Sequence, residues 1–440
     1  MNNKKWMAIL LGGIMAASLA APCSVSAAEK TTLTFWHAMG GTNGEVLQQI
    51  VDDFNASQDE IEIKAEYQGT YDDTITKLKA AMQSDSGLPD VCQMYDVGTK
   101  FMYDSGAVIP VEDKFESTGY DKSSVMEVIS SYYTVDGKQY AMPFNVSTPM
   151  LYYNKDVFEA AGLDPETPPT TYDEVLEDSK KIVDSGAAPV GYSQAIYGWF
   201  FEQQLAGLGV TYGNNDNGRK EAVTAVDFDS NGGGLKVFDM WKKLYDSGYF
   251  EDYGTTTADT QTAFFSGQVG MIIESTAILK NAVDSSPFEV GTGYLPRIEQ
   301  NDEGGVIIGG GSLWLTDTGN EANEDAAWKF IEYITTPDVQ AKWSMGTGYF
   351  AINEKAYETE DMKAYLKENP NFETAINQLK DSPVNCNTAG VLSGVQTEAR
   401  LTFNEIMPQV YDGKLTTQDA VDQLAASVNK AIENYNESIK

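Results

Sequence analysis

The stretch "PFNVSTPMLYYNKD" (residues 143–156) sets a polar, proline-bracketed segment directly before an apolar one. The apolar part, 150–153, has the composition of a buried strand. Prolines cannot donate to a strand ladder, and they bias the preceding residue toward extended backbone. Residues 143–149 therefore predict a break in front of a core strand. The residues alone leave two interpretations open, a plain proline-rich loop and a functional crossing between two parts of the molecule.

Before this break, strand and helix patterns alternate along the chain. Residues 31–36 and 61–67 alternate in polarity and 88–96 form an apolar run, which predicts strands, while 43–57 and 71–82 carry apolar residues at helical spacing. This βαβαβ order predicts an α/β fold with a mostly parallel sheet covered by helices. Ligand sites on such sheets lie beyond the carboxyl ends of the strands, so 67–71 and 95–99 are expected to border a site.

After the break, the alternating pattern starts again. Thr171 and Glu174 have the spacing of a capping box. An amphipathic helix is predicted over 233–248, a buried strand over 268–275 and a helix beginning at the N-cap Ser275. Residues 304–317 predict strand, glycine bend, strand. From Glu321 onward the pattern is mostly helical.

The bulk composition limits the possible partners and cofactors. The 440 residues carry a formal net charge of −35, with 42% hydrophobic and 22% charged residues, which is ordinary for globular proteins and enough for two domains. Such an acidic surface repels nucleic acid and anionic lipid, so neither is expected as a partner. His37 is the single histidine, which argues against a histidine-based zinc site, and no cofactor or metal is predicted. A hydrolase that uses paired carboxylates stays open on composition.

The N-terminus predicts export. Lys4 and Lys5 precede an apolar run of sixteen residues (6–21), shorter than the roughly 20 residues of a membrane span, and a small-residue segment follows. Residues 1–27 are therefore interpreted as a signal peptide cleaved near Ala28. Lipid attachment at Cys23 is the alternative, but Pro22 directly before it does not suit the lipoprotein pattern. The mature chain keeps Cys92 and Cys386, which do not make a disulfide scaffold.

Several motifs carry a family resemblance. They are "LTFWHAMGG", "GTYDD", "MYDVGT", "MPFNVSTPMLYYNKD", "GLDPETPPTTYDE", "VIIGGGSLWL", "GTGYFAIN" and "DGKLTTQDAVD". From about Thr32 to the C-terminus the chain resembles the extracellular solute-binding proteins (family 1) of ABC importers, and within them those that bind glycerol-3-phosphate. The patterns "FNxSTPxLYYNKD" and "IIGGxSLW" are the most specific to that group.

This resemblance implies a two-lobed, periplasmic-binding-protein-like fold of type II, with several hinge crossings and a ligand held in the cleft between the lobes. The break at 143–149 is then a hinge crossing. The first lobe is expected to comprise 28–144 and 276–318, and the second 145–275 and 319–440. The implied protein is an exported, soluble monomer, periplasmic or extracellular, that delivers its ligand to the membrane subunits of an ABC permease.

The resemblance also implies a set of ligand contacts. They are Tyr71, Asp96, Ser147, Trp199, Ser275, Gly310, Tyr349 and Arg400. In the family, the arginine at the position of Arg400 holds the phosphate, which suits a planar guanidinium. Ser275 caps a helix start that favours an anion, and Gly310 lets backbone approach the ligand. From the residues alone, Arg400 could equally be a structural salt-bridge partner, whereas Arg219 lies in a polar loop and is interpreted as solvated.

Two departures from the family pattern bear on the ligand. Asp96 stands where the family usually has glutamate, and Ile196 stands where the glycerol-3-phosphate binders have the first of two tryptophans. The predicted function is therefore capture of glycerol-3-phosphate or a glycerophosphodiester for an ABC importer. An oligosaccharide is the alternative ligand, and a secreted carboxylate-dependent hydrolase is the alternative from another class.

Overall fold

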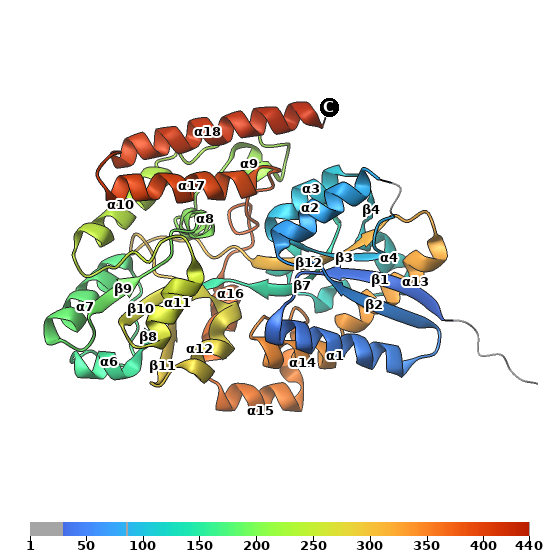
Figure 1. The fold of residues 1–440 in the computed structure, drawn as a ribbon, viewed down its shortest axis with the longest axis horizontal. Helices are drawn as coiled ribbons and strands as arrows, with labels where there is room; N and C mark the ends of the chain where they lie inside the picture. Colours follow the sequence, from blue (N-terminus) through green and yellow to red (C-terminus); the bar gives the residue numbers. More distant parts are fainter. Residues whose placement is uncertain (1–29, 85–86, 440) are drawn as a thin grey trace, which may run out of the picture.

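The computed structural model describes residues 30–84 and 87–439, so the predicted signal peptide lies outside the described residues. Two sheets, each covered by helices, form two lobes that lie side by side (Figure 1). We call the lobe built on the six-stranded sheet the first lobe and the lobe built on the four-stranded sheet the second lobe. No helix in the described ranges is both long and apolar enough to cross a membrane.

The first lobe contains the predicted βαβαβ unit. Its strands run in the order β2-β1-β3-β12-β4, and β7 also pairs with β12. The bounds are β1 Thr31–His37, β2 Ile61–Tyr67, β3 Val91–Tyr95, β4 Val108–Ile109, β7 Met142–Ser147 and β12 Gly309–Thr316. Strand β1 is parallel to β2 and β3, as predicted, whereas β12 is antiparallel to its neighbours. The main helices of this lobe are α1 Gly41–Ser57, α2 Tyr71–Met82, α13 Glu321–Ile334 and α14 Pro337–Thr347.

The second lobe is built on the order β11-β8-β10-β9. The bounds are β8 Pro149–Asn154, β9 Val190–Ser193, β10 Val269–Ser275 and β11 Val290–Gly293. Leu151 and Tyr153 point to one face of β8, and that face packs on α7 Tyr172–Ser185, α8 Gly198–Gly207, α10 Gly233–Asp246, α17 Gln396–Tyr411 and α18 Thr417–Ser438. Met150 and Tyr152 point to the other face, where α11 Thr257–Phe265, α12 Leu279–Ser285 and α16 Asn371–Asp381 lie.

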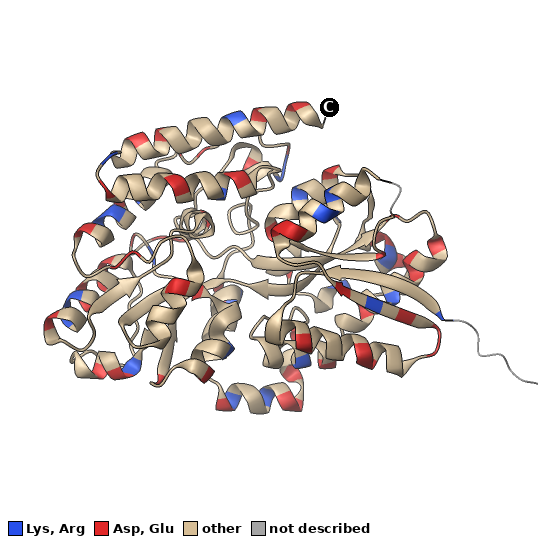
Figure 2. Ribbon diagram, in the orientation of Figure 1, with Lys and Arg blue, Asp and Glu red and all other residues tan. Residues whose placement is uncertain are grey.

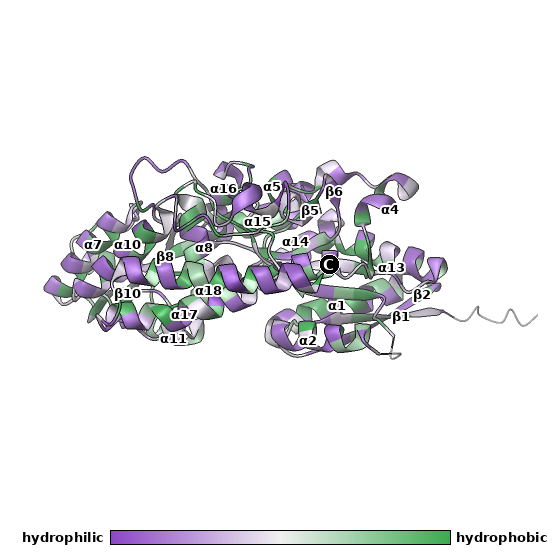
Figure 3. Ribbon diagram, turned by 90° about the horizontal axis from the view of Figure 1, so that it is seen from above, coloured by the Kyte–Doolittle hydropathy of each residue, from purple (hydrophilic) through white to green (hydrophobic). Residues whose placement is uncertain are grey.

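Short helices complete both lobes. They are α3 Thr99–Asp104, α4 Val111–Thr118, α5 Glu127–Ser130, α6 Lys155–Ala160, α9 Asn214–Gly218 and α15 Glu360–Glu368. The capping box at Thr171 and Glu174 is present at the start of α7, as predicted. The face of α18 seen in Figure 3 is largely hydrophilic, and its opposite face buries residues such as Leu424 and Val428 against the second lobe. Acidic residues are spread over the outer helices of both lobes (Figure 2).

The chain passes from the first lobe to the second at Thr148, because β7 pairs with β12 and β8 pairs with β10. The prediction of a crossing there is confirmed, but the prediction that 143–147 break the strand pattern is wrong, since β7 is a strand. Strand β7 tolerates Pro143 because a register shift interrupts its pairing between Gly311 and Ser312 of β12. Thr148 is tied in place by Thr276, whose main-chain N–H donates to its carbonyl oxygen at 2.8 Å.

The sheet membership corrects the expected lobe boundaries in two places. Residues 276–303 stay with the second lobe, because β11 pairs with β8. Residues 321–347 belong to the first lobe, because α13 packs on β1 and β12 and α14 packs on α1. The chain therefore returns to the first lobe at 304–308 rather than at Ser275, and it enters the second lobe again before α16, which contacts β11.

The segment 304–308, through which the chain returns to the first lobe, accounts for a second wrong prediction. Residues 304–308 were expected to form a strand, but the structure gives them none. Side chains take the place of a neighbouring strand: Gln203 both accepts from Ile307 N at 2.8 Å and donates to Ile307 O at 2.7 Å. Ser382 accepts from Val306 N at 3.1 Å. The apolar pattern of this segment thus reflects a buried crossing rather than a ladder partner.

Candidate ligand-binding site between the lobes

The predicted site residues come from both lobes and lie where β3, β7 and β10 end and β12 begins, near α8 and α17. Tyr71 begins α2 and Asp96 directly follows β3, so both lie at the carboxyl edge of the parallel strands, as expected. Ser147 ends β7 and Ser275 ends β10. The second lobe contributes Trp199 from α8 and Arg400 from α17, while Gly310 lies in β12 and Tyr349 follows α14.

Arg400 is the centre of a buried charge cluster. Its Nε and Nη2 donate to the two carboxylate oxygens of Glu202, both at 2.7 Å. Its Nη2 also donates to Asp96 Oδ2 at 2.7 Å, across the boundary between the lobes. The three side chains are each less than a tenth exposed. Burial by itself would lower the pKa of Arg400, but the carboxylates of Asp96 and Glu202 raise it well above its ordinary value, so the guanidinium stays charged.

A second group of contacts joins two predicted tyrosines in the first lobe. Asn145 Nδ2 donates to the hydroxyl of Tyr71 at 2.7 Å. The ring of Tyr71 stacks on Tyr95 with centroids 5.1 Å apart, and Tyr349 stacks on Trp343 at 5.7 Å. Burial raises the pKa of both Tyr71 and Tyr349, so both keep their hydroxyl protons. The structure therefore offers two rigidly held, neutral hydroxyls from the first lobe.

The glycine of β12 has a structural cause of its own. Gly310 has φ +93°, and an added Cβ would overlap the carbonyl oxygen of Asn145 on the paired strand β7. Its lack of a side chain is thus already required by the sheet, before any ligand is considered. The neighbouring Gly309 pairs with Ser147, and a Cβ there would meet the ring of Trp199. The indole nitrogen of Trp199 is buried without a partner in the described part of the chain.

Ser275 acts as the predicted cap. Its Oγ accepts from Ala277 N at 3.2 Å, at the start of a 3-10 turn (Thr276–Ile278) that leads into α12. Its carbonyl accepts from the hydroxyl of Tyr152 at 2.7 Å, and it pairs with Pro149, two residues after Ser147. The helix start predicted at this position is confirmed, although its first turn is a 3-10 turn rather than α-helix.

Arg219 differs from its interpretation as a solvated loop residue. Its Nε donates to Gly390 O at 3.0 Å, one Nη donates to Tyr132 O at 2.8 Å, and the other reaches Ala389 O. The guanidinium also lies over the Tyr132 ring at 5.1 Å. Arg219 thus ties α9 to two other segments of the chain, and the interpretation is wrong. A polar sequence around an arginine does not show where the side chain goes, because three main-chain carbonyls can solvate it instead of water.

Several residues of this region were missed from the sequence. Glu202 lies inside the otherwise uncharged run 198–207, and an isolated charge in an apolar helix is a signal that could have identified it. Asn145 and Thr397 gave no such signal. Thr397 Oγ1 lies 2.8 Å from the hydroxyl of Tyr95, which makes a second contact between the lobes beside the Asp96–Arg400 pair. Both interlobe contacts involve residues at the carboxyl end of β3, Tyr95 as its last residue and Asp96 directly after it.

The arrangement suits reversible binding rather than bond cleavage. Both carboxylates nearest the centre of the site, Asp96 and Glu202, are engaged by Arg400. A glycoside hydrolase needs one carboxyl group as an acid and a second as a base or nucleophile. Here Arg400 already occupies both carboxylates with hydrogen bonds of 2.7 Å. What the site offers a ligand is one guanidinium, neutral tyrosine hydroxyls and serine hydroxyls.

Comparison with known proteins supports a binding role. A model of bacterial extracellular solute-binding proteins matches residues 49–374. The chain is 31% identical over 417 residues to the sn-glycerol-3-phosphate-binding periplasmic protein UgpB of Shigella flexneri serotype 5b, covering 93% of this chain and 94% of that protein. The protein of the same name from Escherichia coli K12 is 30% identical with the same coverage.

Solved structures show the same architecture. The cyclic α-maltosyl-1,6-maltose-binding protein of Arthrobacter globiformis has a TM-score of 0.76 and 26% identity, covering 92% of this chain and 100% of its own. UgpB of Mycobacterium tuberculosis, solved in complex with glycerophosphocholine, has a TM-score of 0.79 and 20% identity, covering 92% and 99%. Similarity at this level supports the two-lobed fold and leaves the ligand open.

Proposed function

The chain belongs to the bacterial extracellular solute-binding proteins and is the substrate-binding component of an ABC transporter, and from this premise we propose that it carries a phosphate ester of glycerol. The ligand would be glycerol-3-phosphate or a glycerophosphodiester, held between the lobes and handed to the permease without covalent chemistry. We propose Tyr71, Asp96, Ser147, Trp199, Ser275, Gly310, Tyr349 and Arg400 as its contacts, with Glu202 as the residue that positions Arg400.

The observation that carries this proposal is how the guanidinium of Arg400 is held. Glu202 takes the edge formed by Nε and Nη2. The other edge, formed by Nη1 and Nη2, is directed to the first lobe, where Asp96 takes one bond from Nη2. Among the described residues, Nη1 donates no hydrogen bond. An arginine fork binds a phosphate through two parallel N–H···O bonds, so a phosphate would take this second edge and displace Asp96 toward a glycerol hydroxyl.

The charge of the cluster favours one ester over the other. One guanidinium and two carboxylates give a formal charge of 1 − 2 = −1. A phosphate monoester carries about −1.5 to −2 at pH 7, whereas a diester carries one negative charge. Because like charges repel strongly in a partly desolvated site, the diester is the better match. The relatives at 30% identity are named for glycerol-3-phosphate, so the monoester stays the other member of the proposal.

An oligosaccharide is the second candidate, and a specific observation favours it. Buried carboxylates and flat aromatic surfaces are the groups that bind neutral sugars, and the site holds the stacked Tyr71–Tyr95 pair together with Trp199. The Arthrobacter neighbour is named for a maltose-based ligand. A neutral sugar would leave the Asp96–Arg400 pair in place and would not need the free edge of the guanidinium.

Calorimetry with a panel of ligands tests the proposal. Glycerophosphocholine, glycerol-3-phosphate, glycerol and maltose are titrated into the same ligand-free preparation at one pH and one salt concentration. We expect the diester to bind at least tenfold more tightly than glycerol, and maltose to give no heat of binding. Binding of maltose alone would replace the phosphate proposal with the oligosaccharide.

Export is part of the same proposal. We propose that the chain is cleaved near Ala28 and acts as a soluble monomer outside the cytoplasmic membrane, as the signal-like N-terminus indicates. N-terminal sequencing of the mature protein checks it, and a lipid-modified Cys23 as the first residue would contradict it.

A further inference from the structure

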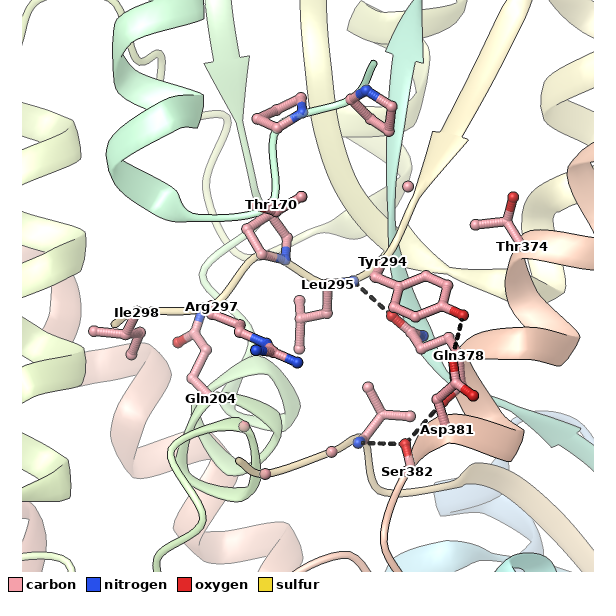
Figure 4. A pocket seen from close by; sticks show the side chains of 18 of the residues that line it. Thr170, Gln204, Tyr294, Leu295, Arg297, Ile298, Thr374, Gln378, Asp381 and Ser382 are labelled. Carbon is pink, nitrogen blue, oxygen red and sulfur yellow. Dashed lines mark hydrogen bonds between the residues drawn. The ribbon is translucent and has the colours of Figure 1, made fainter. Parts of the chain in front are cut away.

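A cavity of about 530 Å³ lies in the second lobe and shares no residue with the proposed interlobe site. Its walls are the turn before α7, the segment that follows β11, the crossing segment 304–306 and one side of α16 (Figure 4). Its volume lies within the range of about 300–1,000 Å³ that is usual for sites of drug-sized ligands.

The polar groups at the base of this cavity already have partners within the protein. Gln378 accepts from Leu295 N at 2.5 Å and donates to Pro149 O at 2.7 Å. Gln204 accepts from Trp241 Nε1 and donates to the hydroxyl of Tyr172, and Ser382 donates to Gln378 O. A ligand that covers these polar groups therefore does not have to supply hydrogen bonds to them. Apolar side chains, among them Leu295 and Val306, complete that surface.

Arg297 is the exception. Figure 4 shows its guanidinium pointing into the cavity, toward Leu295. Its backbone is fixed, because its N–H donates to Thr170 O at 2.8 Å and its carbonyl accepts from Tyr172 N at 2.9 Å. Within residues 30–84 and 87–439, the guanidinium makes no hydrogen bond or ion pair. By contrast, Arg219 and Arg400, the other two arginines of the chain, each make three.

The acidic side chains around the cavity are engaged elsewhere. Asp381 accepts from the hydroxyl of Tyr294 at 2.7 Å. Asp302 accepts from Glu299 N at 2.7 Å, and Glu299 pairs with Lys236 at 2.8 Å. None of these carboxylates lies within 4.0 Å of the Arg297 guanidinium. The guanidinium of Arg297 is exposed at the edge of the cavity, and the carboxylate of Asp302 acts on it electrostatically without a direct ion pair.

We propose that this cavity is a second binding site, for an organic anion with an apolar body and a carboxylate or sulfonate head. The apolar body would lie against Leu295 and Val306, and the head would pair with Arg297 at the cavity wall. A phosphate ester of glycerol does not fit this description, because it has no apolar body. The second site therefore selects a different class of ligand from the interlobe site, and the two can be filled independently.

A matched pair of fluorescent probes tests this inference. The sulfonate 1-anilinonaphthalene-8-sulfonate and the neutral N-phenyl-1-naphthylamine share one aromatic body and differ in the charged head. Each is titrated into the wild-type protein, Arg297→Gln and the control Lys220→Gln, which removes an exposed charge outside the cavity. Titrations are repeated in Leu295→Trp, which narrows the cavity.

The inference predicts a distinct pattern over these variants. Arg297→Gln should weaken the sulfonate at least tenfold and leave the neutral probe within twofold, Leu295→Trp should weaken both, and Lys220→Gln should change neither. Equal sulfonate affinity in wild type and Arg297→Gln would overturn the inference. The readout uses no ligand of the interlobe site, so it is unaffected if the proposed function fails.

Discussion

At the scale of single residues, the main feature of the cleft is that Arg400 donates hydrogen bonds to a carboxylate of each lobe, Asp96 and Glu202. Arg400 could be identified from the sequence as either a phosphate ligand or a salt-bridge partner, and the structure shows the salt bridge with a second edge directed to the other lobe. The motif located the residue but could not supply its partners. Glu202 lies 198 positions away along the chain, and pairings over such separations depend on how the helices pack.

Asp96→Asn tests the role of charge at this site. The change keeps the shape and an acceptor oxygen but brings the cluster from a formal −1 to zero, so it should favour the more highly charged ligand. We expect the affinity ratio of glycerol-3-phosphate to glycerophosphocholine to rise by about tenfold, which is about 1.4 kcal/mol. Calorimetry on both ligands measures it. Asp113→Asn, on the outer surface of the first lobe, is the control and should leave the ratio unchanged.

His37 gives the chain a measurable pH dependence. It is 6% exposed at the end of β1, and burial lowers its pKa to about 4, although its Nδ1 accepts from Met39 N. The unfolded chain therefore binds the proton first as the pH falls below about 6.5, and the folded state loses stability until about pH 4. From pH 7.5 to 5 the loss should be about 2 kcal/mol.

Urea unfolding at both pH values measures this loss. His37→Asn keeps an acceptor for Met39 N but cannot titrate in this range, so the wild type should lose about 2 kcal/mol more than the variant. Because the chain has a single histidine, no other imidazole contributes. An equal loss in both proteins would contradict the assignment.

At the scale of elements, the sequence predicted most of the helices and misjudged the strands at the crossings. The helices at 43–57, 71–82 and 233–248 are all present, because each carries its own amphipathic period and needs no distant partner. The predictions for 143–147 and 304–308 were both wrong, in opposite senses. The proline-containing segment 143–147 is a strand, and the apolar segment 304–308 is not. What decides them is the neighbour each one meets, β12 in one case and the side chain of Gln203 in the other.

Gly310→Ala tests the pairing of β7 with β12. A Cβ there would overlap the carbonyl oxygen of Asn145, and φ +93° is unfavourable for alanine. We expect a loss of about 3 kcal/mol or more in the free energy of unfolding. Gly319→Ala is the control, because it has φ +70° with nothing within 4 Å, and it should cost about 1 kcal/mol. Equal losses would show that the strand contact adds nothing.

At the scale of the whole molecule, direct contacts hold the two lobes together. Besides Asp96–Arg400 and Tyr95–Thr397, the hydroxyl of Tyr435 on α18 donates to Asp104 of α3 at 2.6 Å. On the first lobe these contacts lie in the segment from the end of β3 to α3, and on the second lobe they lie in α17 and α18. The two lobes are therefore in direct contact in this structure, and we expect each contact to contribute to the balance between open and closed forms.

Tyr435→Phe should shift that balance toward the open form. The change removes one interlobe hydrogen bond to a charged acceptor and leaves Asp104 paired with Lys100. In small-angle scattering, the ligand-free variant should have a larger radius of gyration than the ligand-free wild type, and the two should converge at saturating ligand. Tyr333→Phe, within the first lobe, should scatter like wild type. A variant that matches wild type without ligand would show that this contact does not hold the lobes.

At the level of the whole architecture, the periodic patterns predicted the α/β sheet and the motifs predicted the two lobes. Alternating strands and helices predicted an α/β sheet, and the family resemblance supplied the two lobes. The expected lobe boundaries are wrong at 276–303 and 321–347, because contacts far apart in the chain decide them: β11 pairs with β8, and α13 and α14 pack on the first lobe.

The central claim is that Arg400 binds the phosphate of a glycerol ester between the lobes, and calorimetry with glycerophosphocholine on Arg400→Ala tests it most directly. Truncating one partner of a buried charged pair costs about 2–5 kcal/mol, so affinity should fall by roughly thirty-fold to a few thousand-fold. Arg297→Ala, the matched arginine outside the cleft, should bind like wild type, and the melting temperature of each variant checks that it is folded. If folded Arg400→Ala binds glycerophosphocholine as tightly as wild type does, the claim is wrong.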